Sequence, residues 1–121
     1  MPSLDMSGPF DFTSQEIDRR VESKRIGNYA LGNMKDDGTT FIVKYVGRSD
    51  TYLNAELKAR LDKPYRKFKF SYASSAREAF EKECHNYHDF GGKESLDNKV
   101  HPARSPGTNW SCPVLGCTEL Q

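Results

Sequence analysis

The chain has 121 residues, of which 36% are hydrophobic and 29% are charged, which fits one small domain with a modest core. Eighteen lysines and arginines against 17 aspartates and glutamates give a net charge of +1, so overall charge favours neither nucleic acid nor another charged partner. No run approaches the ~20 apolar residues that a membrane span needs. The first residues lack a secretory signal, and the three cysteines are then expected in a reduced, cytoplasmic location.

Two segments precede the first predicted strand of the main domain. Residues 1–12 contain two prolines and a glycine, which predicts a loose arm. Thr13 and Glu16 have the spacing of a capping box, and a short amphipathic helix is predicted from 13 to 24. We therefore expect residues 1–24 to form an arm and a helix ahead of the domain.

A β-hairpin is predicted next. A short strand at 25–32 is followed by a turn at 33–38 that is rich in Asn, Asp and Gly. The segment 39–47 is rich in β-branched and aromatic residues and is the strongest strand signal in the chain. Two strands around such a turn favour an antiparallel pair.

A helix over 51–61 follows, with Ser49 or Asp50 as its predicted cap. Its leucines recur at every fourth residue and form one apolar stripe, at Leu53, Leu57 and Leu61. The segment 67–72 then alternates aromatic residues with lysine and serine, which predicts a third strand with its aromatic side chains on one face.

The last long element is a predicted helix over 75–88, which opens on the capping-box pair Ser75 and Glu78. Residues 89–121 carry Gly, Pro, Asn and Ser at the density of loops, so mostly irregular chain is expected there, with at most one short helix. The predicted fold is α+β, with a small three-stranded antiparallel sheet flanked by helices. An irregular C-terminal tail, 101–121, is expected to pack on the domain.

Glu83 falls on the apolar side of this helix, where a carboxylate is unexpected. Helical spacing places it among five less polar positions, Ala76, Ala79, Phe80, Cys84 and Tyr87. A buried carboxylate costs several kcal/mol unless it is paired, protonated or bound to a cation. Glu83 is therefore a boundary residue, the partner of a core arginine, or a metal ligand.

Several short motifs occur in an order that resembles the GIY-YIG nuclease domain. "GNY" at 27–29 and "YVG" at 45–47 lie in the two strands of the predicted hairpin. A helix, a third strand and a helix carrying "EAFEKE" at 78–83 follow, and Asn98 comes shortly afterwards. The resemblance covers about residues 25–100.

The resemblance implies a nuclease-like domain that hydrolyses nucleic-acid phosphodiester bonds, with DNA the expected substrate, using one Mg²⁺ or Mn²⁺ ion. By position, Tyr29 and Tyr45 match the two motif tyrosines, Glu83 matches the metal-binding glutamate, and Asn98 matches a late asparagine of the site. Gly47 would let the backbone approach phosphate closely. A tyrosine that takes a proton from water would need a pKa lowered from ~10, which a metal ion and an arginine would provide.

One position departs from the family pattern. The family expects a phosphate-facing arginine on the helix after the second motif, and the matching position here is Glu56. Arg48 and Arg60 lie nearby and either can supply a guanidinium, although neither is in register. The sequence therefore predicts weak or no cleavage, and a gain of activity on Glu56→Arg.

The segment "KPYRKFKF" at 63–70 concentrates positive charge. Four cations there are candidates for phosphate contacts in nucleic acid, namely Lys63, Arg66, Lys67 and Lys69. The alternative is an edge strand whose solvated lysines prevent pairing with other sheets. Two further alternatives for the whole chain are a non-catalytic nucleic-acid-binding module of the same fold and a protein-interaction module.

The C-terminal segment brings together residues that suit zinc. His88, His101, Cys112 and Cys117 would give two imidazoles and two thiolates for tetrahedral coordination. The alternative is a tail with reduced thiols in which His101 bonds to backbone. Cys84 is expected to be a buried helix residue.

Overall fold

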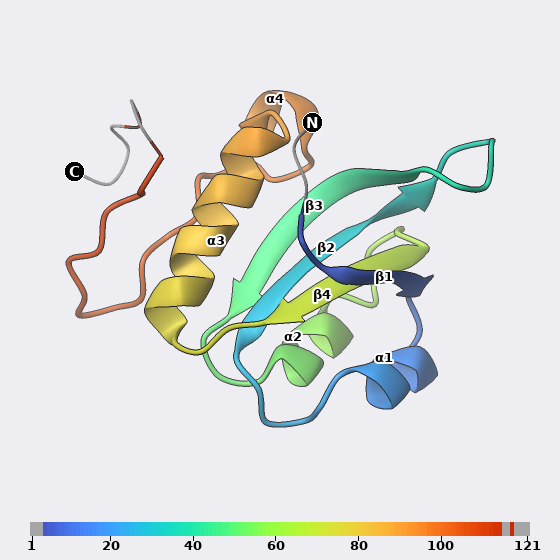
Figure 1. Cartoon of the computed structure of the whole chain (residues 1–121), viewed down its shortest axis with the longest axis horizontal. Coiled ribbons are helices and arrows are strands. Elements are labelled where there is room, and N and C mark those ends of the chain that lie inside the picture. The colour runs from blue at the N-terminus through green and yellow to red at the C-terminus, as the bar shows by residue number, and fades with distance from the viewer. Residues whose placement is uncertain (1–3, 115–116, 118–121) are drawn as a thin grey trace.

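The computed structural model describes residues 4–114 and 117. The fold is α+β, as predicted, with helices on both sides of an antiparallel sheet (Figure 1). In chain order the elements are β1 (Ser7–Asp11), α1 (Ser14–Arg20), β2 (Gly27–Met34), β3 (Phe41–Ser49), α2 (Leu53–Ala59), β4 (Lys67–Tyr72), α3 (Ala76–Asp89) and α4 (Gly92–Ser95).

The sheet has four strands in the order β1-β4-β2-β3, so the prediction of three strands was wrong. The predicted hairpin is confirmed as β2 and β3, and β4 pairs with the other side of β2. The fourth strand is β1, which lies in the segment expected to be a loose arm. Phe10 is opposite Phe68 in the β1–β4 pairing, and their rings lie 5.7 Å apart. Because β1 covers β4, the lysine-bearing strand is internal and the edge-strand interpretation is also wrong.

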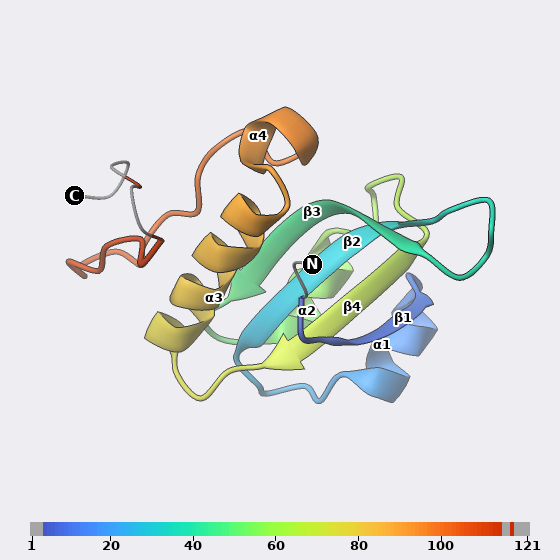
Figure 2. The same ribbon diagram turned by 45° about the horizontal axis from the view of Figure 1, so that its top comes forward.

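Side chains alternate between the two faces of the sheet, and each face has its own core. Tyr29 and Leu31 of β2 pack with Leu57 of α2, together with α1. Ala30 of β2 packs with Tyr87 of α3 on the opposite face. Figure 2 shows α3 beside β3 and β2, away from α1 and α2.

Two of the predicted helix starts are confirmed, and one is wrong. The Thr13 side chain accepts a hydrogen bond from the Glu16 backbone N–H at the start of α1. The Ser75 side chain accepts one from the Glu78 backbone N–H at the start of α3. Helix α2 instead begins after Tyr52, without a side-chain cap. The Ser49 hydroxyl accepts a hydrogen bond from the Thr51 backbone N–H, and the Asp50 carboxylate accepts one from Arg48.

The described part of the tail packs against α3, and α4, which precedes the tail, is the one short helix found among the described residues after α3. The ring of Trp110 lies 5.9 Å from that of Phe80, and Cys112 is buried beside Phe80 and Cys84. Residues 1–3 of the arm and 115, 116 and 118–121 of the tail lie outside the described residues. Within the described residues, no helix is long and apolar enough to cross a membrane.

Candidate functional site

Glu83 is buried on α3 and is paired with an arginine. Arg48, at the end of β3, donates from Nη1 to Glu83 Oε1 at 2.7 Å and from Nε to Asp50 Oδ1 at 2.8 Å. Its Nη2 donates to the carbonyl of Ala103 at 2.6 Å, while the Ser105 hydroxyl bonds to Asp50. We call these five residues the Arg48 network. It joins β3, α3 and the tail.

Burial dominates the protonation of Glu83. It raises the pKa of this carboxyl to about 7, and the hydrogen bond from Arg48 opposes the shift without cancelling it. The negative charges of Asp50 and Glu56 raise the Glu83 pKa further. The carboxyl of Asp50 behaves differently, because the Arg48 and Ser105 bonds outweigh burial and lower its pKa.

The raised pKa of Glu83 predicts a pH dependence of stability. The folded protein keeps the Glu83 proton up to about pH 7, whereas the ordinary value is 4.5. The folded state therefore binds more protons than the unfolded state between these values, and stability falls as pH rises through this window. Chemical unfolding should show that Glu83→Gln removes about 3 kcal/mol of this fall. The exposed variant Glu94→Gln should keep the wild-type pH profile, and an unchanged profile in Glu83→Gln would contradict the assignment.

A second cluster lies on the other face of the sheet, where α2 packs on β2 and β3. Tyr29 donates its hydroxyl proton to Glu56 Oε2 at 2.9 Å, and Arg60 donates from Nε to the same oxygen at 3.1 Å. The Tyr45 ring stacks 6.3 Å from that of Tyr29, and the Arg60 guanidinium lies 6.0 Å from the Tyr45 ring centre. We call these four residues the Glu56 network. Glu56 is thus neutralised by a neighbouring cation rather than standing alone.

Gly47 has a different local role from the one expected. A Cβ at this position would collide with the ring and hydroxyl of Tyr29. The Tyr29 side chain therefore occupies the space next to the Gly47 Cα. Tyr29 itself is only 1% exposed and holds Glu56 in place rather than meeting a substrate. Tyr45 is half-buried and is the accessible tyrosine of the pair.

The tyrosine pKa values run opposite to the expectation of a lowered pKa. Burial raises the pKa of Tyr29, and the charge of Glu56 raises it further. Burial also raises the pKa of Tyr45; Arg60 opposes this, while Glu83 and Glu56 add to it. Both hydroxyls therefore stay protonated near neutral pH, and that of Tyr29 donates to Glu56.

The two networks approach each other around the edge strand β3. Tyr45 and Arg48 are three residues apart on this strand, with side chains on opposite faces. The charge of Glu83 acts on Tyr45, and that of Glu56 acts on Glu83. The structure therefore brings Tyr29, Tyr45, Arg48, Arg60 and Glu83 to one end of β3, divided between the two faces.

Asn98 pairs with backbone and not with either network. Its Oδ1 accepts from the Val46 N–H at 3.0 Å, and its Nδ2 donates to the Val46 carbonyl at 2.8 Å. The carboxamide thus replaces a strand neighbour on the outer edge of β3 and fixes the segment after α4 there.

Of the four cations predicted to contact phosphate, Arg66 and Lys67 line one hollow beside Pro64. Lys67 pairs with Asp11 of β1, and Lys69 lies over the Phe41 ring at 5.5 Å. The Arg66 backbone bonds to Asn33. Lys63 instead lines a separate pocket beside Tyr45.

The four predicted zinc ligands come together. The ligand atoms of His88, His101, Cys112 and Cys117 all lie within 4.8 Å of one another. The two Nε2 atoms are 3.2 Å apart, and Cys117 Sγ is 3.4 Å from His101 Nε2. This His2Cys2 cluster could hold a metal ion, and it joins the end of α3 to the tail.

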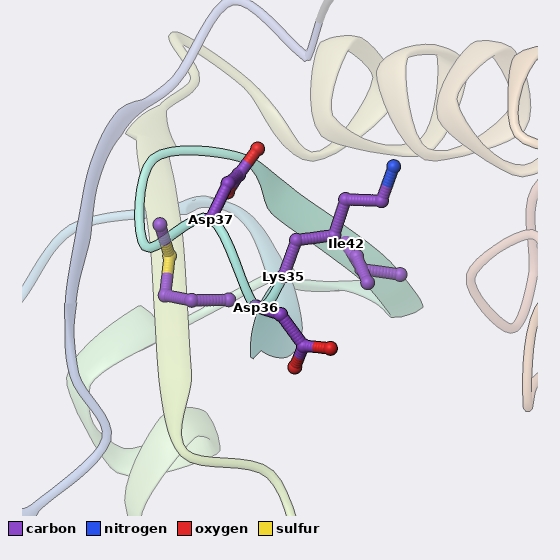
Figure 3. A pocket seen from close by; sticks show the side chains of 5 residues that line it. Lys35, Asp36, Asp37 and Ile42 are labelled. Atoms are coloured by element: carbon purple, nitrogen blue, oxygen red, sulfur yellow. The ribbon is translucent and has the colours of Figure 1, made fainter.

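One hollow is excluded as the site. It has a volume of about 430 Å³ at the β2–β3 turn and is lined by Met34, Lys35, Asp36, Asp37 and Ile42 (Figure 3). The Asp37 carboxylate is used within the turn, where it accepts from the backbone of Thr39 and Thr40. None of the predicted site residues lines it.

Sequence reasoning missed Asp50, Ala103 and Ser105 of the Arg48 network. Asp50 was assigned to a helix cap, and Ala103 contributes only a backbone carbonyl, which leaves no signal in a sequence.

Comparison of the chain with protein-family models, curated proteins and solved structures finds no match.

Proposed function

We propose that this protein is a zinc-stabilised, nuclease-like domain that acts on nucleic-acid phosphodiesters. The zinc part rests on one observation, the convergence of four ligand atoms within 4.8 Å. Zn–N bonds of ~2.0 Å and Zn–S bonds of ~2.3 Å in a tetrahedron separate two nitrogens by about 3.3 Å and a nitrogen from a sulfur by about 3.5 Å. The His88–His101 and Cys117–His101 separations of 3.2 and 3.4 Å match these edges.

The hydrogen bond on the far side of His101 supports the same assignment. His101 Nδ1 lies 2.8 Å from the Pro102 carbonyl, so Nδ1 carries the proton and the lone pair is on Nε2, the atom that faces the cluster. Metal-bound histidines commonly show this arrangement, which fixes the tautomer and the ring orientation. Four protein ligands leave no open position, so the zinc is structural.

Cobalt substitution tests this ligand set. Co²⁺ added to metal-free protein should give the intense visible absorption of tetrahedral coordination, with thiolate-to-metal bands, at one equivalent per chain. His101→Ala should lose the spectrum, while His85→Ala, an exposed histidine on the same helix, should retain it. A weak octahedral spectrum in the wild type would contradict the assignment.

The hydrolytic part rests on the gathering of Tyr45, Arg60, Glu56, Arg48 and Glu83 at one end of β3, together with the resemblance in the order of their motifs. The Arg60 guanidinium near a phosphate would stabilise the negative charge of the transition state, while Arg48 stays bonded to Glu83 and Asp50. Tyr45 keeps its proton and can donate to a phosphoryl oxygen. Among the described residues, only Arg60 and Tyr29 bond to Glu56, both at Oε2, which leaves Oε1 to accept a proton from an attacking water.

Glu83 fits the role of ligand to Mg²⁺ or Mn²⁺. Arg48 occupies Oε1, and within the described part of the chain Oε2 accepts no hydrogen bond. Mg²⁺ commonly takes one or two carboxylates and keeps several waters. Bound there, the ion would neutralise charge that develops on the phosphate.

Glu56 now has a predicted role opposite to the one its position first suggested. If Glu56 takes a proton from water, Glu56→Gln should lower the cleavage rate by about 10²–10⁴-fold, measured on mixed DNA and RNA with Mg²⁺ or Mn²⁺. Glu22→Gln, on an exposed loop, should leave the rate unchanged. A rate that rises on Glu56→Gln would instead mean that this carboxylate repels phosphate.

The binding-module alternatives have distinct outcomes in the same assay. Nucleic-acid affinity that falls steeply with salt, without cleavage, would identify a non-catalytic nucleic-acid-binding domain. Absence of both would leave a protein-interaction domain.

A further inference from the structure

A small pocket opens beside Tyr45 on the α2 side of the sheet. It has a volume of about 200 Å³ and is lined by Leu31, Tyr45, Arg60, Lys63, Tyr65, Asp97 and Lys99. These residues come from β2, β3, the end of α2, the turn before β4 and the segment after α4. The pocket shares Tyr45 and Arg60 with the Glu56 network, while its other residues take no part in the proposed reaction.

The outer wall of this pocket is fixed by specific hydrogen bonds. The side chain of Asn98 makes two bonds to Val46, and the Asp97 N–H donates to the Lys44 carbonyl. The Tyr65 hydroxyl then donates to Asp97 Oδ2 at 2.6 Å, which ties the turn before β4 to the same wall. Asn98 thus places its neighbour Lys99 at the pocket, a role that does not require contact with substrate.

The charges of the pocket do not cancel. Its one carboxylate, Asp97, already accepts the Tyr65 proton, and Arg60 is shared with Glu56. Lys63 and Lys99 form no ion pair with any of the described residues, and both side chains are exposed at the pocket. The turn that carries Lys63 is closed by the bond from its N–H to the Arg60 carbonyl. Lys63 comes from this turn and Lys99 from the segment after α4, so two separate chain segments supply cations to the pocket.

We propose that this pocket binds one phosphate group of a nucleic-acid strand next to the phosphate that is cut, with Lys63 and Lys99 as its charge partners. This inference rests on the proposed nuclease function, and it adds a second phosphate position. The volume is below the ~300 Å³ of ordinary small-molecule sites, which fits a phosphate ester better than a whole cofactor. The rings of Tyr45 and Tyr65 give the adjoining sugar or base an apolar surface.

Fluorescence anisotropy with labelled oligothymidylate of six nucleotides tests the proposal, in buffer without Mg²⁺ or Mn²⁺. The double variant Lys63→Ala/Lys99→Ala should bind at least tenfold more weakly than wild type. The slope of log affinity against log salt should decrease in magnitude by about 0.7, because the contact with one phosphate of a single strand is lost. Lys24→Ala/Lys35→Ala, which removes the same charge from two other exposed positions, should bind as wild type does.

Two further arms identify the phosphate. Tighter binding of the 5′-phosphorylated oligonucleotide would assign the pocket to a terminal phosphate, and equal binding would assign it to the backbone; thymidine should not compete. An equal loss in both double variants, or no loss in either, would overturn the proposal. Because binding is measured without the catalytic ion, a protein that binds in this way but does not cut refutes only hydrolysis.

Discussion

Loss of the metal from the His2Cys2 cluster should release the tail from α3. A ligand present at a thousand times its dissociation constant stabilises the folded state by ~4 kcal/mol, and zinc sites of this type bind more tightly than that in isolated peptides. The described cluster joins His88 at the end of α3 to three ligands between 101 and 117. We therefore expect Cys112→Ser to lower the free energy of unfolding by at least 4 kcal/mol in zinc-buffered solution.

Limited proteolysis gives this prediction a local readout. Cleavage between 101 and 114 should become rapid in Cys112→Ser and in wild type treated with a zinc chelator, while the sheet stays resistant. Cys84→Ala is the matched control, because Cys84 is buried beside Cys112 but is not one of the four ligands. Equal resistance of the tail with and without zinc would show that packing of Trp110 on Phe80 holds it alone.

Within the Arg48 network, removal of the Arg48 side chain should be the most destabilising change. Its side chain is 10% exposed and that of Glu83 is 11% exposed, so Arg48→Ala leaves a buried carboxylate without its charge partner. Such losses cost about 3–5 kcal/mol. The cost should be largest above pH 7, where Glu83 is ionised, and smaller at pH 5, where burial keeps its proton on. Unfolding in urea at both values measures this difference.

Two controls separate charge from packing. Arg77→Ala breaks an exposed pair with Glu81 on the same helix and should cost less than 1 kcal/mol. The double variant Arg48→Met/Glu83→Gln removes both charges and should recover most of the stability. A pH-independent cost for Arg48→Ala would mean that the loss comes from packing on Phe80, whose ring lies 5.1 Å from the guanidinium.

Most of the helices and strands were predicted because patterns of residues close together in the sequence determine them. The alternation in 67–72 and the capping residues Thr13 and Ser75 correspond to β4, α1 and α3 as found. Strand β1 could not be found in this way, because Pro9 and Gly8 mark a break and the strand exists through pairing with β4, some 60 residues away. The alternation of Phe10 and Phe12 was its one local signal.

The candidate sites also depend partly on local sequence patterns and partly on contacts between distant residues. Helical spacing predicted that Glu83 would be buried, and an arginine partner was one alternative, but Arg48 is 35 residues away and only the fold brings it there. Residue types predicted the four candidate metal ligands, yet their convergence depends on how the tail folds back on α3. The pairing of Glu56 with both Tyr29 and Arg60 was not predicted, because family register assigned Glu56 to an open phosphate position.

Metal analysis of the full chain, purified without chelator, tests the central claim most directly. The proposed zinc site predicts one zinc per chain in the wild type and in Cys84→Ala, and less than a tenth of that in Cys112→Ser and His101→Ala. Absence of zinc from wild type incubated with one equivalent and then dialysed, or full retention in Cys112→Ser, would contradict the claim that His88, His101, Cys112 and Cys117 form a zinc site.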